Sequence, residues 1–482
     1  MIRLSELLAH LPPEPDEARL FPEIRQAVDR SRRRLVVIDD DPTGAQTVHD
    51  VELLLNWNQD LLGATLRKNA RLFYLLTNSR SLPENEAVTL NLDLARQLVG
   101  AAQSAQIDFV LASRSDSTLR GHYPAEIEAL ETALRSSMQT SGFDGHLLVP
   151  AFFEGGRYTI QDTHYVATPD AASDTLLPAH ETPFAKDLVF SYETAYLPGW
   201  IAARSGGRWQ AEEVVSIGLE LIRSGGVAAV VERLQHVSGG CPVIVNAAGY
   251  GDLAVVVLAL LQAEAAGKRF LYRTSASFVR LRGAIENRAL LEQSEVLGDN
   301  PAQGGGIVVV GSYVPGSSLQ LERLLALPNV KGIEIPVGQV IRGAADLNEA
   351  SRVAGEQLEA AVNEGLVGAL YTSRELVTSS ERLANLEIGK QVSQALVKAL
   401  QHLNCRPRYL IAKGGITSHD IAQKGLGVER ARVLGQLLPG VPVWRLEAGT
   451  QPRFQGLPYV VFPGNVGGPD ALAEAVKMLS GD

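Results

Sequence analysis

The chain has 482 residues, of which 45% are hydrophobic and 20% charged, and its formal net charge is −10. This length predicts two or three domains, each with enough residues to bury a core of its own. The acidic balance argues against a chain-wide phosphate-binding surface of the kind that binds nucleic acid. It leaves room for a small positive pocket that binds an anionic metabolite.

The cysteine count and the N-terminus bear on the compartment. Two cysteines, Cys241 and Cys405, allow at most one disulfide and no multi-cysteine zinc site. We therefore expect a reduced, cytoplasmic environment. The first 34 residues lack an apolar core flanked by small residues and contain acidic side chains, which argues against a secretory signal or a transit peptide. The long apolar run from Leu253 is too short to span a bilayer, so no membrane partner is expected.

Short apolar runs bounded by Gly, Pro or Asp alternate with helical patterns through the first half of the chain. Buried strands are expected within residues 34–41, 71–80, 108–116, 145–153 and 241–249. Their nearly continuous apolar character is typical of parallel strands that are covered on both faces. Helical patterns lie between them, for example over 83–105 and 122–138. The alternation predicts an α/β fold with right-handed crossovers.

A composition change near residue 300 divides the chain. Residues 294–306 are rich in glycine, asparagine and proline without periodicity, and we expect them to be an interdomain linker. A second series of strands is expected within 306–312, 332–337, 368–374, 407–415, 441–447 and 457–465. The sequence thus predicts a helical extension over 1–34 and two α/β domains, 35–293 and 307–482, each a largely parallel sheet flanked by helices.

Polar residues collect where the predicted strands end. In open α/β sheets, ligands bind just beyond the carboxyl ends of the strands. The polar clusters are residues 39–41, 77–80, 114–118, 311–312, 413–415 and 463–465. Because they occupy corresponding places in the two predicted domains, we expect them to form the two halves of one active site in an interdomain cleft.

Three consecutive aspartates, Asp39, Asp40 and Asp41, follow the first predicted strand of the α/β pattern. Such carboxylates could orient a hydroxyl, accept its proton, or hold a divalent cation through water. The alternative is a helix cap, with Asp41 or Thr43 accepting backbone N–H groups and Gly44 supplying the turn. Capping explains one acidic residue but not three, so we favour a functional site.

A strand-to-helix turn carries a second dense cluster, with Arg114, Asp116, Ser117, Thr118 and Arg120 in the stretch SRSDSTLRGH. The planar guanidinium of arginine is suited to bidentate recognition of carboxylate or phosphate. A local Arg–Asp pair and a Ser/Thr helix cap are the alternatives. The density of hydrogen-bond donors favours a binding site.

Two further arginines are candidates for contacting an anion. Arg80 follows the neighbouring predicted strand, and Arg157 lies in the polar stretch FFEGGRYT. That stretch is either a loop over the site or an ordinary turn, and the sequence does not separate the two.

Glycine-rich turns follow three predicted strands of the second half. They contain Gly311, Gly414 with Gly415, and Gly464 with Gly467. Glycines let backbone N–H groups approach a phosphate, and a helix N-terminus favours the anion. No G-x-x-x-x-G-K-[ST] occurs, and no G-x-G-x-x-G follows a strand, so neither a P-loop nor the dinucleotide fingerprint is present. Three such turns indicate a nucleotide site of another geometry.

Six motifs occur in a characteristic order: DDPTGAQT, RSDSTLRGH, FFEGGR, GSYVPGSS, KGGITS and PGNVGG. In combination they resemble the four-carbon acid sugar kinase family, from about residue 35 to the C-terminus. The resemblance implies an N-terminal domain that binds the acid sugar and a C-terminal domain that binds ATP. Members of that family phosphorylate threonate, erythronate or 3-oxo-tetronate at the terminal hydroxyl.

The resemblance also implies roles by position. Asp40 and Asp41 match the paired aspartates of the family, and Arg80 matches its substrate-contacting arginine. The family's D-S-T-L-R-G core is matched by Asp116, Ser117, Thr118 and Arg120, and its ATP contacts by Ser312, Gly414, Gly415, Ile416, Thr417, Gly464 and Asn465. Ile416 departs from the family, because many members carry glutamate there, and Phe462 and Val466 depart from the family's K-P-G-N-F-G.

We therefore predict an ATP- and Mg²⁺-dependent kinase of carbohydrate metabolism that phosphorylates a small sugar acid of about four carbons. The base is left open between Asp41, Asp40 and Asp116, no metal ligand is assigned, and a homodimer is one option for its assembly. Substrate contacts are expected from Asp40, Arg80, Arg114, Asp116, Ser117, Thr118, Arg120 and Arg157, and Gly467 is added to the nucleotide contacts. The alternatives are a sugar-acid-binding protein that has lost catalysis, which Ile416 favours, and a Rossmann-type oxidoreductase, which the missing fingerprint disfavours.

Overall fold

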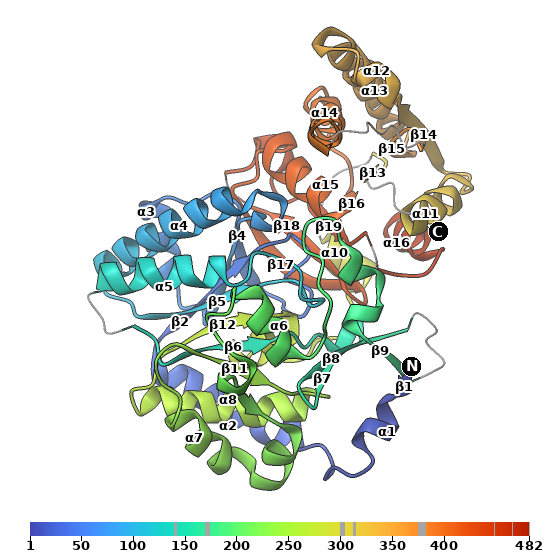
Figure 1. Cartoon of the computed structure of the whole chain (residues 1–482). Helices are drawn as coiled ribbons and strands as arrows, with labels where there is room; N and C mark the ends of the chain where they lie inside the picture. The colour runs from blue at the N-terminus through green and yellow to red at the C-terminus, as the bar shows by residue number, and fades with distance from the viewer. Residues whose placement is uncertain are drawn as a thin grey trace. The chain divides into compact units, whose positions relative to one another are not determined.

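The chain folds into two compact units (Figure 1). The structure is a computed structural model that describes residues 1–138, 142–168, 174–298, 304–311, 315–374, 382–447, 449–464 and 466–481. Unit 1 comprises Met1–Val48 and Trp57–Asn287, and unit 2 comprises His49–Asn56 and Arg288–Asp482. The short segment His49–Asn56 thus belongs to the second unit, although the residues on both sides of it in the sequence belong to the first.

The main sheet of unit 1 is parallel throughout, which confirms the predicted fold class. Its strand order is β10-β11-β6-β12-β5-β2-β4. The strands are β2 (Arg34–Asp39), β4 (Leu72–Leu76), β5 (Phe109–Arg114), β6 (Gly145–Val149), β10 (Val215–Ile217), β11 (Cys241–Val245) and β12 (Phe270–Thr274). Residues Leu72 to Leu76 are buried without exception, as expected for a strand covered on both faces.

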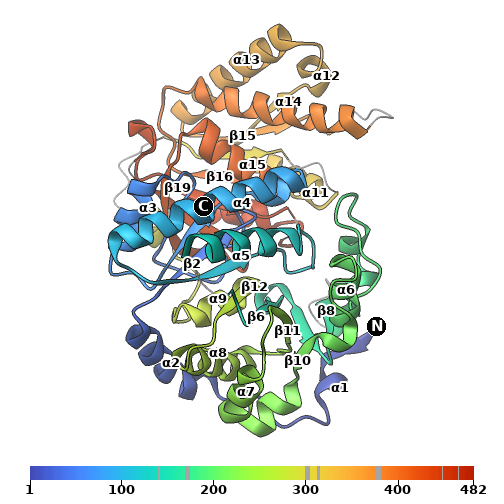
Figure 2. The same ribbon diagram turned by 60° about the vertical axis from the view of Figure 1, so that its left-hand side comes forward.

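Helices cover both faces of this sheet (Figures 1 and 2). One layer is formed by α2 (Glu17–Ser31), α7 (Gly226–Gln235) and α8 (Tyr250–Ala265), and the other by α3 (Gln59–Leu66), α4 (Glu84–Ala105) and α5 (Ala125–Met138). Helix α8 contacts both α2 and α7, so nearly all of its side chains are buried. Helix α4 confirms the predicted helix over 83–105, and Gln106, which caps its C-terminus, has a left-handed φ of 56°.

A small antiparallel sheet in unit 1 has the order β1-β9-β8-β7. It consists of β1 (Ile2–Arg3), β9 (Thr175–Pro178), β8 (Thr163–Ala167) and β7 (Arg157–Ile160). The N-terminal segment supplies β1 as well as the helices α1 (Leu4–Leu8) and α2. Strand β7 continues the FFEGGR stretch and therefore fixes the backbone of Arg157. Unit 1 also contains α6 (Leu197–Arg204) and α9 (Ala276–Arg282).

The sheet of unit 2 combines a parallel and an antiparallel part, in the order β3-β17-β18-β19-β16-β13-β15-β14. The parallel part consists of β19 (Pro458–Phe462), β16 (Leu410–Lys413), β13 (Ile307–Val310), β15 (Val367–Thr372) and β14 (Val330–Ile335). The antiparallel part adds β3 (Val51–Leu54), β17 (Arg430–Leu438) and β18 (Val441–Leu446). Strand β17 is not among the predicted strands, because its residues alternate between buried and exposed positions instead of forming a continuous apolar run.

Helices α11 (Pro315–Leu325) and α16 (Ala471–Ser480) pack together in unit 2, as do α12 (Val337–Val340), α13 (Ala344–Asn363) and α14 (Arg382–Gln401). Helix α15 (Gly415–Asp420) follows β16 directly. The predicted linker region contains helix α10 (Gln293–Leu297), whose residues Val296 and Leu297 belong to the core of unit 2. Residues 299–303 of that region lie outside the described part of the chain. Over the described ranges, none of the helices combines the length and the apolar character needed to cross a bilayer.

Candidate functional site

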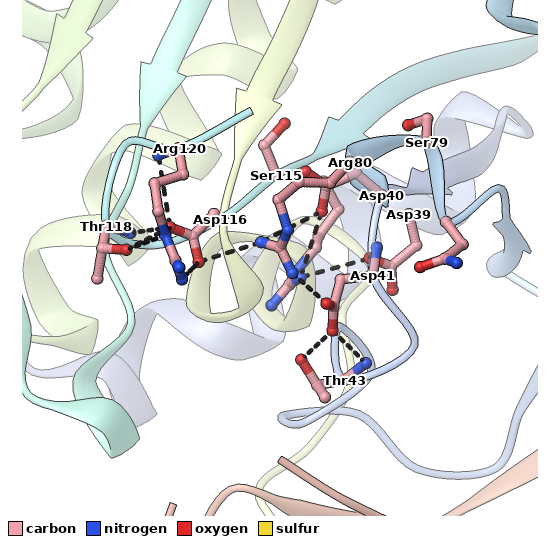
Figure 3. A network of polar contacts seen from close by, with 12 residues as sticks. Asp39, Asp40, Asp41, Thr43, Ser79, Arg80, Ser115, Asp116, Thr118 and Arg120 are labelled. Atoms are coloured by element: carbon pink, nitrogen blue, oxygen red, sulfur yellow. Dashed lines mark hydrogen bonds and ion pairs between the residues drawn. The ribbon is translucent and has the colours of Figure 1, made fainter. Parts of the chain in front are cut away.

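The polar clusters of unit 1 meet at one edge of its sheet. Asp39 at the end of β2 is aligned with Leu76 of β4 and with Arg114 of β5, and Arg114 is aligned with Thr274 of β12. Because neighbouring strands are parallel, the residues that follow them emerge side by side. The structure therefore brings the aspartate triplet, Arg80 and the turn after Arg114 together, as Figure 3 shows for ten labelled residues.

Arg80 lies at the centre of the cluster, between Asp41 and Asp116 (Figure 3). Its Nη1 is 3.1 Å from Asp116 Oδ1 and 3.8 Å from Asp40 Oδ1, while its Nη2 pairs with Asp41 Oδ2. One guanidinium thus links carboxylates that follow two different strands. We call Arg80 and the aspartates Asp39, Asp40, Asp41 and Asp116 the carboxylate cluster.

Asp41 is both a turn-forming residue and an ion-pair partner. Its Oδ1 accepts hydrogen bonds from the Thr43 backbone N–H, at 2.9 Å, and from the Thr43 hydroxyl. Burial raises the pKa of Asp41, but Arg80 and the hydrogen bonds from Thr43 together outweigh it and hold the pKa below its usual value. The carboxylate is therefore ionised at neutral pH, and its side chain keeps an exposed fraction of 15%.

Asp116 organises the turn that follows β5. Its Oδ2 accepts hydrogen bonds from Arg120 Nε at 2.9 Å and from the Thr118 N–H at 3.1 Å, and its Oδ1 accepts one from Arg120 Nη2 at 3.1 Å. Burial opposes ionisation, but Arg120 and Arg80 together bring the pKa of Asp116 well below its usual range. The local Arg–Asp pair that sequence analysis weighed as an alternative exists, and it joins Arg120 to Asp116 of the carboxylate cluster.

Asp39 and Asp40 are the most deeply buried aspartates of the carboxylate cluster. Both are almost fully buried, and Arg114 Nη1 lies 3.4 Å from Asp39 Oδ1 and 3.9 Å from Asp40 Oδ1. Neither oxygen of Asp40 has a hydrogen-bond partner among the described residues. Burial raises the pKa of Asp39 to about 8, against the opposing charge of Arg114, and burial also raises the pKa of Asp40.

Two buried ionisable residues belong to this region and are absent from the sequence-based assignment. Glu126 accepts hydrogen bonds from the Ser79 hydroxyl and from Asn91 Nδ2, and burial together with the charge of Asp40 raises its pKa to about 7. Arg273 donates to the backbone oxygen of Arg120 at 3.1 Å. An arginine inside the apolar strand FLYRT is a signal that sequence analysis could have used, whereas Glu126 stands in an ordinary helical pattern.

Ser117 and Arg157 lie at the rim of the cluster. The backbone oxygen of Ser117 accepts a hydrogen bond from His164 Nε2 at 2.7 Å, which ties the turn to β8. The guanidinium carbons of Arg157 and Arg120 lie 5.5 and 5.2 Å from the ring centre of Phe184. Phe184 is a further residue that sequence analysis did not find, because it lies in a segment without a motif.

The glycine turns of unit 2 also meet at one edge of a sheet. Val310 of β13 is aligned with Lys413 of β16, and Lys413 is aligned with Phe462 of β19. The residues that follow are therefore neighbours, and the Gly414 N–H donates to the Phe462 oxygen at 2.8 Å. A side chain at Gly311 would place its Cβ 2.3 Å from Thr417 Oγ1. The close packing of these turns requires glycine at that position.

The other predicted nucleotide contacts fall in and beside these turns. Gly414 has a φ of 106°, and Ile416 exposes 57% of its surface at the start of α15. Ser312 and Asn465 lie outside the described residues. Gln320 of α11 shapes the last turn, because its Nε2 donates to the backbone oxygens of Val466, Gly467 and Gly468 at 3.1, 3.2 and 2.8 Å.

Lys413 is a buried lysine beside the same turns. Its exposed fraction is 0%, its Nζ donates to the Pro463 oxygen at 3.0 Å, and the ammonium lies 4.4 Å from the ring centre of Phe462. Burial lowers the pKa of Lys413 to about 7. Through its hydrogen bond to the Pro463 oxygen, Lys413 fixes the backbone directly before Gly464.

The structure offers no preformed metal site in the described part of the chain, where no three His, Cys, Asp or Glu side chains converge as a group that could hold an ion. We therefore assign no protein ligand to a metal.

Comparison with known proteins identifies two domains. Residues 35–282 match the model of a sugar-binding N-terminal domain, and residues 307–472 match that of a nucleotide-binding C-terminal domain. The chain belongs to the four-carbon acid sugar kinase family. The carboxylate cluster lies within the first matched range, and the glycine turns lie within the second. No curated protein sequence shows significant similarity to the chain.

Solved structures share the fold. A protein from Salmonella typhimurium LT2, provisionally named a tRNA synthase, has a TM-score of 0.64 at 16% identity, with 92% of this chain and 98% of that chain covered. Haemophilus influenzae protein HI1011 has a TM-score of 0.55 at 17% identity, with 92% and 100% covered. At these identities the likeness shows the fold alone.

Proposed function

We propose that the protein is a kinase that transfers the γ-phosphoryl group of ATP to the terminal hydroxyl of a sugar acid of about four carbons. The observation that carries the proposal is the carboxylate cluster in the sugar-binding domain, where Arg80 joins Asp41 and Asp116 beside further arginines. Phosphoryl transfer depends mainly on positioning and on charge stabilisation. Ionised carboxylates and guanidinium groups held in fixed ion pairs are suited to both.

The charge balance of the cluster favours an anionic acceptor. Burial favours the neutral forms of Asp39 and Asp40, while Asp41 and Asp116 stay ionised. Arginine remains charged in proteins. The guanidinium groups near the cluster therefore exceed the ionised carboxylates in number, and they belong to Arg80, Arg114, Arg120 and Arg157. A bound carboxylate would offset this excess positive charge.

Asp41 is the best placed of the aspartates to receive the hydroxyl proton. A general base must first reach the proton, and its pKa matters only after that. Asp40 is the more basic group but exposes only 4% of its side chain. Gly121 packs closely against it, since a Cβ built at Gly121 would lie 3.3 Å from Asp40 Oδ2. In the proposed reaction the acceptor oxygen forms a bond to the γ-phosphorus, the bond between that phosphorus and the β,γ-bridging oxygen breaks, ADP leaves, and the hydroxyl proton passes to Asp41.

The nucleotide would be held by backbone groups of unit 2. The turns at Gly311, Gly414 and Gly464 lie at the carboxyl ends of adjacent parallel strands, and α15 begins directly after one of them. Backbone N–H groups in such turns suit phosphate oxygens. Mg²⁺ is bound in many kinases mainly by substrate phosphates and water, which fits a chain in which no described residues form a metal cluster.

The test is ADP release in the presence of Mg-ATP and a panel of four- to six-carbon sugar acids and keto acids. We expect turnover with at least one four-carbon acid and none with the corresponding alcohol. Binding of an acid without ADP release from any member of the panel would contradict the kinase proposal and favour a binding protein. A change in nicotinamide absorbance would favour an oxidoreductase instead.

A further inference from the structure

A segment that no motif marks covers one side of the carboxylate cluster. It runs over residues 179–192 and contains two short 3₁₀ helices, Ala179–Glu181 and Pro183–Lys186. We call it the cover segment. Tyr192 fixes it to the site, because its hydroxyl donates to the backbone oxygen of Thr118 at 2.7 Å. The cover segment is therefore held at the turn that carries Asp116 and Arg120.

The cover segment supplies a second carboxylate to Arg120. Asp187 Oδ2 lies 3.5 Å from Arg120 Nη1, on the side of the guanidinium that Asp116 leaves free. Asp187 is itself fixed, since its Oδ1 accepts the backbone N–H groups of Val189 and Phe190 at 2.8 and 3.1 Å. Arg120 is thus paired on two sides, and its positive charge is already offset by the protein.

Arg157 has the opposite surroundings. No described Asp or Glu lies within ion-pair distance of its guanidinium, and its buried Nε has no hydrogen-bond partner in the described residues. Asp116 attracts it electrostatically, and Arg120 repels it. The ring of Phe184 lies against both guanidinium groups, with its centre 5.2 Å from the Cζ of Arg120 and 5.5 Å from that of Arg157. An aromatic face attracts cations, so Phe184 holds two like charges near one another.

From this arrangement we propose that Arg157, positioned by Phe184, receives the carboxylate of the acid substrate. Asp187, together with Asp116, pairs with Arg120 and so keeps Arg120 from binding that carboxylate. The assignment rests on the proposed function for the identity of the acid. It makes the cover segment a determinant of substrate specificity. Phe184 orients Arg157, and Asp187 keeps Arg120 from competing with Arg157 for the substrate carboxylate. Arg157 is the binding residue, and Phe184 and Asp187 are positioning residues.

The test measures binding without nucleotide, by calorimetry with the full chain. Erythronate and threonate are compared with erythritol and threitol, which have the same four-carbon chain but a hydroxymethyl group in place of the carboxylate. We expect Arg157→Gln to weaken binding of the acids by about 10- to 100-fold, as for loss of a charge-assisted hydrogen bond, and to leave binding of the alcohols unchanged. Phe184→Leu should weaken only acid binding, by about 3- to 10-fold. The matched control is Arg208→Gln, because Arg208 pairs with Glu128 at the surface.

A double variant tests the role of Asp187. In the Arg157→Gln background, Asp187→Asn should release Arg120 from its second carboxylate and restore part of the acid binding, about 3- to 10-fold. The absence of any rescue would overturn the role of Asp187. Equal loss of acid and alcohol binding in Arg157→Gln, or an undiminished preference for acids, would overturn the role of Arg157. If acids bind with this dependence but none yields ADP, the kinase proposal fails while the assignment of the acid-binding group stands.

Discussion

The two candidate sites are built from different kinds of groups. In unit 1 the site consists of charged side chains that are buried against one another, and Arg80 alone approaches three carboxylates. In unit 2 the site consists of backbone turns, and the buried Lys413 contacts a carbonyl oxygen and an aromatic ring. Side chains can present both a hydroxyl-orienting carboxylate and a carboxylate-binding guanidinium. Backbone amides suit the phosphate groups of a nucleotide, which are the same whichever acceptor is phosphorylated.

The comparison also predicts different sensitivities. A site of buried ion pairs depends on the protonation state of its members and loses function when one charge is removed. A site of glycine turns depends on close backbone packing and loses function when a side chain is added. The four predictions that follow test this difference.

The largest effect is expected from Asp41→Asn in unit 1. The amide cannot accept the hydroxyl proton, so kcat for ADP release should fall by about 10²- to 10⁴-fold, while the melting temperature changes little because Asp116 still pairs with Arg80. Asp93→Asn is the matched control, since Asp93 pairs with Arg96 at the surface, away from the cluster. Normal turnover of Asp41→Asn together with inactivity of Asp40→Asn would move the base to Asp40.

Glu126→Gln should change how stability depends on pH. The folded protein holds the proton of Glu126 up to about pH 7, whereas the unfolded chain releases it near 4.5. Between these values the native state binds more protons, so the free energy of unfolding falls as pH rises. The full contribution is on the order of 3 kcal/mol, at about 1.4 kcal/mol for each pKa unit.

Urea unfolding at pH 5 and pH 8 measures this contribution. Glutamine keeps the oxygen that accepts from Ser79, so the variant should lose less stability than the wild type between the two pH values. Glu128→Gln on the same helix is the control, because Glu128 is paired with Arg208 at the surface. Identical pH profiles for wild type and Glu126→Gln would show that Glu126 does not carry the buried proton.

Gly311→Ala probes the packing of the turns in unit 2. The added Cβ would meet Thr417 Oγ1 at 2.3 Å and force the turns apart. We expect the KM for ATP to rise about 10-fold, equivalent to about 1.4 kcal/mol, with the affinity for the acid unchanged. Gly316→Ala, where an added Cβ meets nothing within 4 Å, is the control. A larger effect on acid binding than on ATP would contradict the division of roles between the units.

The smallest effect on nucleotide binding is expected from Lys413→Met. The folded protein releases the proton of Lys413 near pH 7, whereas the unfolded chain keeps it to about 10.5. Between these pH values the native state therefore binds fewer protons than the unfolded chain. The free energy of unfolding of the wild type should consequently gain a contribution from Lys413 that rises with pH over this range. Methionine removes this contribution and one hydrogen bond to Pro463, worth about 1 kcal/mol.

Unfolding curves at pH 7 and pH 9.5 compare the wild type with Lys413→Met and with Lys477→Met, a control at an exposed position. The KM for ATP should rise only a few-fold, because the turn loses one hydrogen bond, from Lys413 Nζ to the Pro463 oxygen. If Lys413→Met keeps the pH slope of the wild type, the lysine does not titrate in its buried position.

Local pattern was sufficient for the strands and helices that carry the motifs. The apolar runs that end at Asp39 and Arg114 form β2 and β5, and the helical pattern over 83–105 forms α4. A parallel strand buried on both faces must be apolar along its length, so its sequence is distinctive. Strand β17 is half exposed and antiparallel, so its alternating pattern is less distinctive.

By itself, the sequence determined the fold class, the family and the places where polar residues follow strands, because these depend on short-range periodicity and on motif order. The tertiary structure decided which charges compensate one another. Glu126, Phe184, Asp187 and Arg273 approach the cluster from segments without a motif. Arg120 pairs with Asp187, which is far from it in the sequence, as well as with the nearby Asp116, whereas no described Asp or Glu pairs with Arg157. Whether a carboxylate is ionised, or a guanidinium is free to bind a ligand, depends on burial and on groups within a few ångströms. Those neighbours come from distant parts of the chain and meet only when it folds.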